Sequence, residues 1–155
     1  MHSKDEIKKF REDFWQGFKE HMYGKKSSGG YRINWLNYPT KLKNIRINLF
    51  ADNKHASVCL DFEHKNAGIR ELHYEQLLEC KKVMTDCFEH CPLEWYLEYI
   101  RENGKEITRV CTVPLKSSIF RPDDWPTTYE YLEKGIISMD KFWVDFGAIF
   151  DDLQS

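Results

Sequence analysis

The sequence predicts an α+β fold in two layers, an antiparallel sheet of about five strands with helices packed mainly on one face, in the order α-β-β-β-α-β-β-α-α. Three observations point to this class. Two segments flanking ADNKHA alternate apolar and polar residues, as half-buried strands do. An Asn-Gly pair at 103–104 separates two more strand-like segments, and both ends of the chain carry apolar residues at helical spacing. A chain of 155 residues lies within the single-domain range, so we expect one domain over 1–155.

The first helix is predicted over residues 4–22. Ser3 and Glu6 match a capping box, in which each side chain satisfies a free backbone amide of the first turn. One face of this helix is apolar and consists of Ile7, Phe10, Phe14, Trp15, Phe18 and Met22. The following GKKSSGG has no apolar residue, which predicts a flexible loop over 24–30.

A three-stranded meander is predicted next, from YRINWLNY at 31–38 and the alternating segments 44–50 and 56–63. A tight turn at 53–54 fixes the register of the last two strands. This register pairs Leu49 with Val58, Ile47 with Leu60, Ile45 with Phe62 and Arg46 with Asp61.

The second half begins with a predicted helix over 69–88, followed by strands over 94–101 and 106–113. Asn103-Gly104 favours a type I′ turn between these strands. The resulting pairs are Arg101 with Glu106, Glu98 with Arg109 and Leu97 with Val110.

Two helices are expected to close the chain. Asp124 is expected to cap the first, which tolerates Pro126 in its first turn and ends at Gly135. Ser138 then opens the last helix.

Composition narrows the function classes. Lys and Arg total 23 against 25 Asp and Glu, a net charge of −2, so the chain lacks the overall basic excess of most phosphate-binding domains. Five cysteines and no signal-peptide core indicate reduced thiols and a cytoplasmic location. The sequence has no apolar run of membrane-spanning length, and without a P-loop or Gly-x-Gly-x-x-Gly pattern we expect no cofactor.

The stretch LDFEHK raises the question of a metal-dependent nuclease, with Asp61, Glu63 and Lys65 as catalytic candidates. Such a centre needs a second acidic ligand, but the predicted register leaves Asp52 about 30 Å from Glu63. Asp61 shares a strand face with Glu63, yet Arg46 opposite offers it an ordinary cross-strand ion pair. The stretch therefore favours a polar strand face.

A zinc site is the other metal hypothesis. Cys87, His90 and Cys91 cluster in CFEHC, and Cys80 precedes them on the same predicted helix. Zinc takes four ligands from spaced pairs, and a second pair at suitable separation is missing from the sequence. We expect no metal.

Basic and aromatic residues alternate between positions 24 and 46. The candidate binding residues are Lys25, Lys26, Arg32, Trp35 and Arg46. Lysine and arginine with interleaved aromatic rings can follow a single nucleic-acid strand by charge and stacking. The alternative is a solvated loop and edge strand, where lysines discourage sheet aggregation.

The segments FWQGF, IRINLFADNKHASVCLDFEHK and SIFRPDDWPTTYEYLEKGI together resemble a bacterial family numbered 4268 among domains of unknown function. The resemblance covers nearly the whole chain. In that family a similar unit often follows a restriction-endonuclease-like domain, which implies an accessory or recognition role and supplies no catalytic residues. The element order is also similar to that of type III secretion chaperones, which are small dimers, by fold analogy alone.

The leading hypothesis is a non-enzymatic interaction module that binds nucleic acid or a protein partner through the outer sheet face and the basic loop. One alternative is a nuclease-like protein using Glu63 and Lys65. The other is a chaperone-like homodimer that binds proteins.

Overall fold

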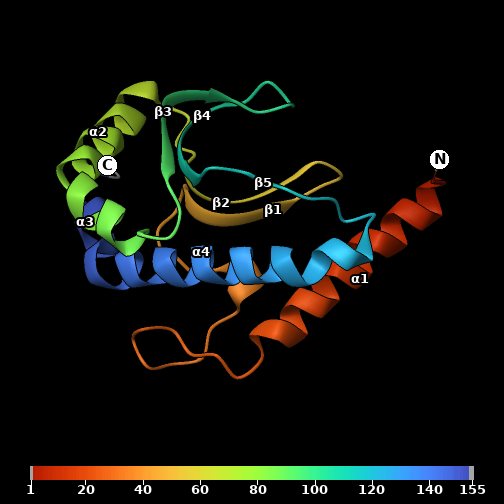
Figure 1. Ribbon diagram of the computed structural model, residues 1–155. Coiled ribbons are helices and arrows are strands. Elements are labelled where there is room, and N and C mark those ends of the chain that lie inside the picture. Colours follow the sequence, from red (N-terminus) through yellow and green to blue (C-terminus); the bar gives the residue numbers. More distant parts are fainter. Residues whose placement is uncertain (1, 154–155) are drawn as a thin grey trace.

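A computed structural model describes residues 2–153 and confirms the α+β class with one antiparallel sheet of five strands (Figure 1). The elements in chain order are α1 (Lys4–Met22), η1 (Trp35–Asn37), β1 (Ile45–Ala51), β2 (His55–Phe62), α2 (Ala67–Glu79), α3 (Lys81–Cys87), β3 (Leu93–Ile100), β4 (Glu106–Thr112), β5 (Leu115–Lys116), η2 (Pro122–Asp124), α4 (Trp125–Phe146) and η3 (Gly147–Leu153). Within residues 2–153, none of the helices combines the length and the apolar character that crossing a membrane requires.

The sheet has the strand order β1-β2-β4-β3, and β5 pairs with the other end of β2. In Figure 1, α4 runs beneath β1 and β2, and α2 and α3 lie beside β3. Val58 points toward α4, where it faces Gly135. Because side chains alternate along a strand, the odd-numbered residues of β2 point away from α4. That opposite side, which we call the outer sheet face, carries Asn48, Asp61 and Arg109.

The first helix forms as predicted, with the Ser3–Glu6 capping box in place. Its apolar face buries Phe14 and Phe18 completely, against the N-terminal half of α4. The Tyr129 hydroxyl of α4 donates a hydrogen bond of 2.6 Å to the carbonyl oxygen of Phe14. The position of α1 is therefore fixed by packing and by one specific polar contact.

The hairpin of β1 and β2 has the predicted register, including Arg46 opposite Asp61. The strand predicted over 31–38 is wrong, because the segment forms the short 3-10 helix η1 instead. The Asn34 side chain accepts hydrogen bonds from the backbone amides of Leu36 and Asn37, which offers this backbone a local alternative to a sheet. The fifth strand is β5, which the sequence did not suggest.

The hairpin of β3 and β4 occurs where predicted, but its register is wrong. The Gly104 amide donates to Arg101, and Arg101 pairs with Lys105, so the loop has three residues with Gly104 at φ +85°. Ile100 therefore lies opposite Glu106, and an irregularity between Tyr96 and Tyr99 shifts the register again. Neither predicted charged pair forms.

The predicted helix boundaries need two corrections. The helix expected over 69–88 is broken at Cys80 into α2 and α3. The two helices expected at the end are one, because α4 continues through Gly135. Pro126 does lie in the first turn of α4, but the Asp124 carboxylate accepts from the Ser118 amide and makes no capping bond to α4.

Gly135 lies inside α4 because the helix approaches β2 too closely for a side chain. A Cβ atom at this position would lie 2.7 Å from Cγ2 of Val58, which is itself fully buried. We expect Gly135→Ala to lower the free energy of unfolding by about 1–3 kcal/mol in urea titrations, although alanine favours helices. The double variant with Val58→Ala should lose less unfolding free energy than the two single variants lose in sum, because the smaller side chain relieves the contact. Simple additivity would contradict this explanation.

Candidate functional site

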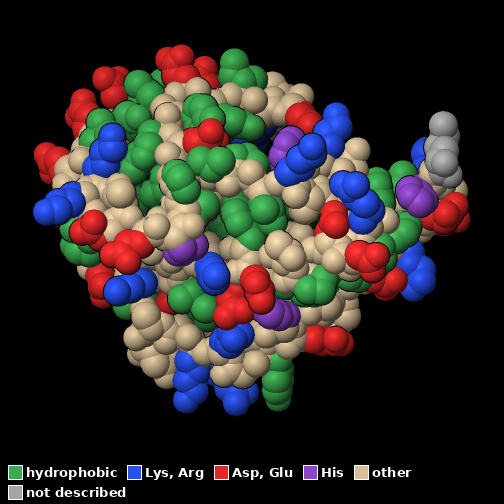
Figure 2. All heavy atoms as spheres, viewed as in Figure 1, with side chains coloured by type: hydrophobic (Ala, Val, Ile, Leu, Met, Phe, Trp, Pro, Cys, Tyr) green, Lys and Arg blue, Asp and Glu red, His purple; other side chains and the backbone are tan. Residues whose placement is uncertain are grey.

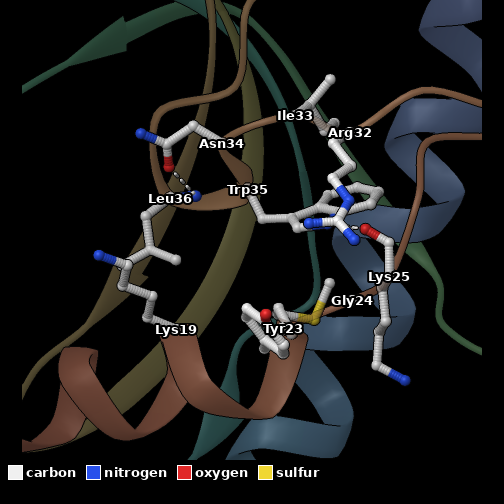
Figure 3. A pocket seen from close by; sticks show the side chains of 10 residues that line it. Lys19, Tyr23, Gly24, Lys25, Arg32, Ile33, Asn34, Trp35 and Leu36 are labelled. Carbon is white, nitrogen blue, oxygen red and sulfur yellow. Dashed lines mark hydrogen bonds between the residues drawn. The ribbon is translucent and has the colours of Figure 1, made fainter.

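A pocket of about 470 Å³ opens between the C-terminal end of α1 and residues 32–36 (Figure 3). We call it the α1-end pocket. Its lining residues are Lys19, Met22, Tyr23, Gly24, Lys25, Arg32, Ile33, Asn34, Trp35 and Leu36. Three of them are basic, and the Tyr23 side chain at the mouth is 81% exposed.

Trp35 joins the two walls of this pocket. Its indole nitrogen donates a hydrogen bond of 3.0 Å to the Lys25 carbonyl, as Figure 3 shows, and only 5% of the residue is exposed. The ring is part of the hydrophobic core, so it forms the inner wall of the pocket and has little surface left to contact a ligand. Tyr23, which the sequence analysis did not select, is the aromatic ring available to a ligand.

The loop between the walls is fastened to α4 by a buried carboxylate. Asp140, 1% exposed, accepts hydrogen bonds from the hydroxyls of Ser27 and Tyr38 and from the Ser28 amide, at 2.6–2.7 Å. Burial raises the pKa of Tyr38, and its hydrogen bond to Asp140 adds to that effect. The flexibility predicted for 24–30 stays a prediction, whereas these contacts fix Ser27 and Ser28 in place.

The sequence did contain a signal for this anchor. Asp140 follows the buried Ile136 by four positions and precedes the buried Trp143 by three, so it lies on the apolar stripe of α4. A carboxylate on a buried stripe requires hydrogen-bond donors from elsewhere. Those donors come from Ser27, Ser28 and Tyr38, more than a hundred residues away, which the stripe alone does not identify.

The charges around the pocket are only partly neutralised. Nζ of Lys25 lies 3.1 Å from a Glu133 oxygen, and His21 lies 2.6 Å from the other oxygen of the same carboxylate. Burial opposes ionisation of Glu133, but the hydrogen bonds from His21 and Lys25 prevail and lower its pKa. Lys19 and Arg32 have no ion-pair partner within residues 2–153, so they carry the free positive charge of the pocket.

Basic side chains also project at the lower rim of the molecule in Figure 2, in the region where Figure 1 shows the loop that follows α1. Elsewhere on this face acidic and basic side chains are mixed. The positive character is thus local, in keeping with the overall charge of −2.

Three of the five predicted binding residues, Lys25, Arg32 and Trp35, line this pocket together. Lys26 is exposed but is not among the lining residues. Arg46 lies on β1, where its guanidinium is 3.5 Å from the Asn37 side chain, and it lines a separate polar pocket that also includes Glu63.

Asp61 is fully buried on the outer sheet face at the centre of an ion-pair network. Nε and Nη2 of Arg109 donate to its two oxygens at 2.7 and 3.0 Å, while Asn48 and Arg101 donate at 2.7 and 3.0 Å. The partner expected from the sequence was Arg46, which is opposite in register but does not bind Asp61. The two guanidinium partners come instead from β4 and from the residue that follows β3, and Asn48 of β1 adds an amide donor.

Glu63 also bonds to Arg101, while Lys65 is exposed just beyond the strand. A metal ion at Asp61 and Glu63 would have to displace both guanidinium groups, which favours an ion-pair network over a nuclease centre at this place. Within residues 2–153, no three His, Cys, Asp or Glu side chains are grouped as metal ligands.

Aromatic rings complete the network. The Arg109 guanidinium lies 4.2 Å from the ring centroid of Tyr99 and 4.9 Å from that of Phe50. Burial opposes its charge, but the hydrogen bonds and charge of Asp61 outweigh this effect and raise the pKa of Arg109. Its planar charge is thus held between two rings and a bidentate carboxylate.

The fold and site define an α+β domain with one antiparallel sheet, a buried ion-pair network on its outer face and a basic pocket beside its first helix. The chain belongs to the family described as a domain of unknown function, DUF4268, whose model matches residues 10–146. No curated protein and no solved structure matches it.

Proposed function

We propose that this chain is a non-enzymatic binding module that contacts single-stranded nucleic acid at the α1-end pocket. The observation that carries the proposal is the combination of Lys19, Arg32 and the exposed Tyr23 around one opening. Lys19 and Arg32, which have no ion-pair partner within residues 2–153, can bind consecutive phosphates, and the exposed Tyr23 ring can stack on a base.

A single strand suits this pocket better than a duplex. Stacking on Tyr23 requires an unpaired base, and Lys19 and Arg32 line one small opening, whereas acidic and basic side chains are mixed over much of the face shown in Figure 2. An acidic peptide would use the same cations but would bring no base for Tyr23. The contribution of Tyr23 therefore distinguishes a nucleic-acid ligand from an acidic protein segment.

The test is fluorescence anisotropy with a labelled single-stranded DNA oligonucleotide. We expect binding at about 50 mM salt that weakens as salt rises, because phosphate contacts release counterions. Tyr23→Ala should weaken binding by roughly 5–150-fold, the range for loss of one stacking contact of about 1–3 kcal/mol. The Lys19→Ala/Arg32→Ala variant should reduce both the affinity and its salt dependence.

A matched control is Lys8→Ala/Arg11→Ala, which removes the same charge from exposed positions of α1. Lys8 precedes Lys19 by about 16 Å along the helix. This control should bind almost as well as the wild type. Equal loss in both double variants would indicate a general charge effect, and no binding at low salt would refute the proposal.

An acidic peptide serves as a second probe. If Tyr23→Ala leaves oligonucleotide binding unchanged and the peptide competes for the pocket at equal concentration, a protein partner replaces nucleic acid as the ligand.

A further inference from the structure

Two of the five free cysteines, Cys59 and Cys111, lie directly opposite one another on β2 and β4. The hydrogen bonds of the hairpin show how their backbones are oriented. The Asp52 amide donates to His55 and the Glu63 amide donates to Asn44, so the odd-numbered residues of β2 direct their backbone polar groups toward β1. Cys59 and Cys111 are therefore a non-hydrogen-bonded pair.

This class of pair brings side chains close together. Directly opposed residues without mutual hydrogen bonds have Cα atoms about 4.5 Å apart, and disulfides span Cα separations of about 4.4–6.8 Å. The neighbouring pair Asp61 and Arg109 is of the same kind and is joined by two hydrogen bonds, which holds the two strands in register at this point.

The two thiols also differ in acidity. A hydrogen bond from Cys59 lowers the pKa of the Cys111 thiol, burial opposes this, and the charge of Arg109 lowers the pKa further. Burial raises the pKa of Cys59. Cys111 therefore carries the larger share of reactive thiolate, and the residue is 6% exposed against 1% for Cys59.

We propose that Cys59 and Cys111 form an oxidisable dithiol, which a peroxide converts into a disulfide that joins β2 to β4. The Cys111 thiolate attacks one peroxide oxygen, the O–O bond breaks, and hydroxide leaves, which gives a sulfenic acid. The Cys59 sulfur then displaces the hydroxyl group of that sulfenic acid, and the released hydroxide takes a proton as water. In total two thiols and one hydrogen peroxide give one disulfide and two waters.

The other three cysteines are less suited to this reaction. Burial raises the pKa values of Cys80, Cys87 and Cys91, which keeps these thiols protonated. Neither Cys80 nor Cys87 lies on the sheet, and Cys91 precedes β3. Oxidation should therefore select one pair out of five thiols.

The experiment treats the full chain with hydrogen peroxide, alkylates the remaining thiols and maps tryptic peptides by mass spectrometry. Cleavage after Lys54, Lys65, Arg109 and Lys116 separates the two cysteines into HASVCLDFEHK and VCTVPLK. We expect these peptides to be linked with the loss of two hydrogens, three alkylated cysteines to remain, and a thiol reductant to reverse the link.

Two comparisons make the result specific. Cys59→Ser and Cys111→Ser should each abolish the link, whereas Cys80→Ser should leave it intact. In concentrated urea the preference for this pair should disappear, because only the folded sheet places the two residues opposite one another. A link from Cys111 to Cys91, separate overoxidation of the two thiols, or two unreacted thiols would each overturn the proposal.

Discussion

Asp61→Asn is expected to destabilise the protein by about 3–5 kcal/mol, because it leaves Arg109 buried without a compensating charge. The substitution keeps the size of the side chain but removes its negative charge and replaces one of the two acceptor oxygens, which serve the guanidinium groups of Arg101 and Arg109, with an amide donor. Urea titration followed by circular dichroism gives the free energy of unfolding. The control is Glu12→Gln, since Glu12 is an exposed residue of α1 whose nearest ion-pair atom lies 3.9 Å away, and its effect should stay within about 0.5 kcal/mol.

A second variant separates charge from packing at the same place. Asp61→Leu/Arg109→Met replaces the bidentate pair by apolar side chains, and such replacements are often close to neutral. We expect the double variant to be more stable than Asp61→Asn alone. If Asp61→Asn matched the wild type in stability, the network would contribute no more to the free energy of unfolding than an exposed ion pair does, which would contradict this prediction.

The second large effect concerns His73, which is fully buried against the rings of Phe62 and Phe150. Neither ring nitrogen has a hydrogen-bond partner within residues 2–153. Burial, aided by the charge of His64, lowers the pKa of His73 from 6.5 to about 4. The folded protein therefore holds this imidazole neutral at pH values where the unfolded chain protonates it.

The sign of the pH effect follows from this difference. Above about pH 6.5 both states are neutral and the contribution to stability is complete, and it is lost as the pH falls from 6.5 toward 4. At pH 4.5 the loss amounts to roughly 2.5 kcal/mol. We expect urea midpoints of the wild type to fall with acid over this interval.

His73→Leu isolates this contribution from that of other titrating groups. The variant removes from the core two nitrogens that have no partner in the described part of the chain, and it should be more stable than the wild type by about 1–3 kcal/mol at pH 8. Its advantage should grow by roughly 2.5 kcal/mol between pH 8 and pH 4.5. His55→Gln, at an exposed position, should keep the wild-type pH profile, and parallel profiles for the wild type and His73→Leu would contradict the assignment.

Local patterns in the sequence were enough to predict the fold class, the capping box of α1 and the register of the β1–β2 hairpin. In that hairpin the alternation of apolar and polar residues on both strands is consistent with a single register. They were not enough where a local competitor decided the outcome. The hydrogen bonds to the Asn34 side chain favour a 3-10 turn over the predicted strand. The three-residue loop that contains Gly104 shifts the register of the β3–β4 hairpin by one residue.

The candidate sites were predicted less completely for a different reason. Lys25, Arg32 and Trp35 were recognised because they are close in sequence, and they do meet around one pocket. The bidentate partner of Asp61, Arg109, was missed because it depends on β4 lying next to β2, a relation between strands about fifty residues apart. Periodicity within one segment carries no information about which segments become neighbours.

The anchor at Asp140 has a consequence for how the α1-end pocket behaves in solution. The carboxylate connects the loop after α1, the segment after η1 and the last long helix, so opening the loop would leave a buried carboxylate without its donors. Such a loop cannot detach at low energy as ordinary surface loops do. The backbone amides in the walls of the pocket should therefore exchange their hydrogens with solvent only when the cooperative unit that contains α4 opens. The binding surface should persist until the whole domain unfolds.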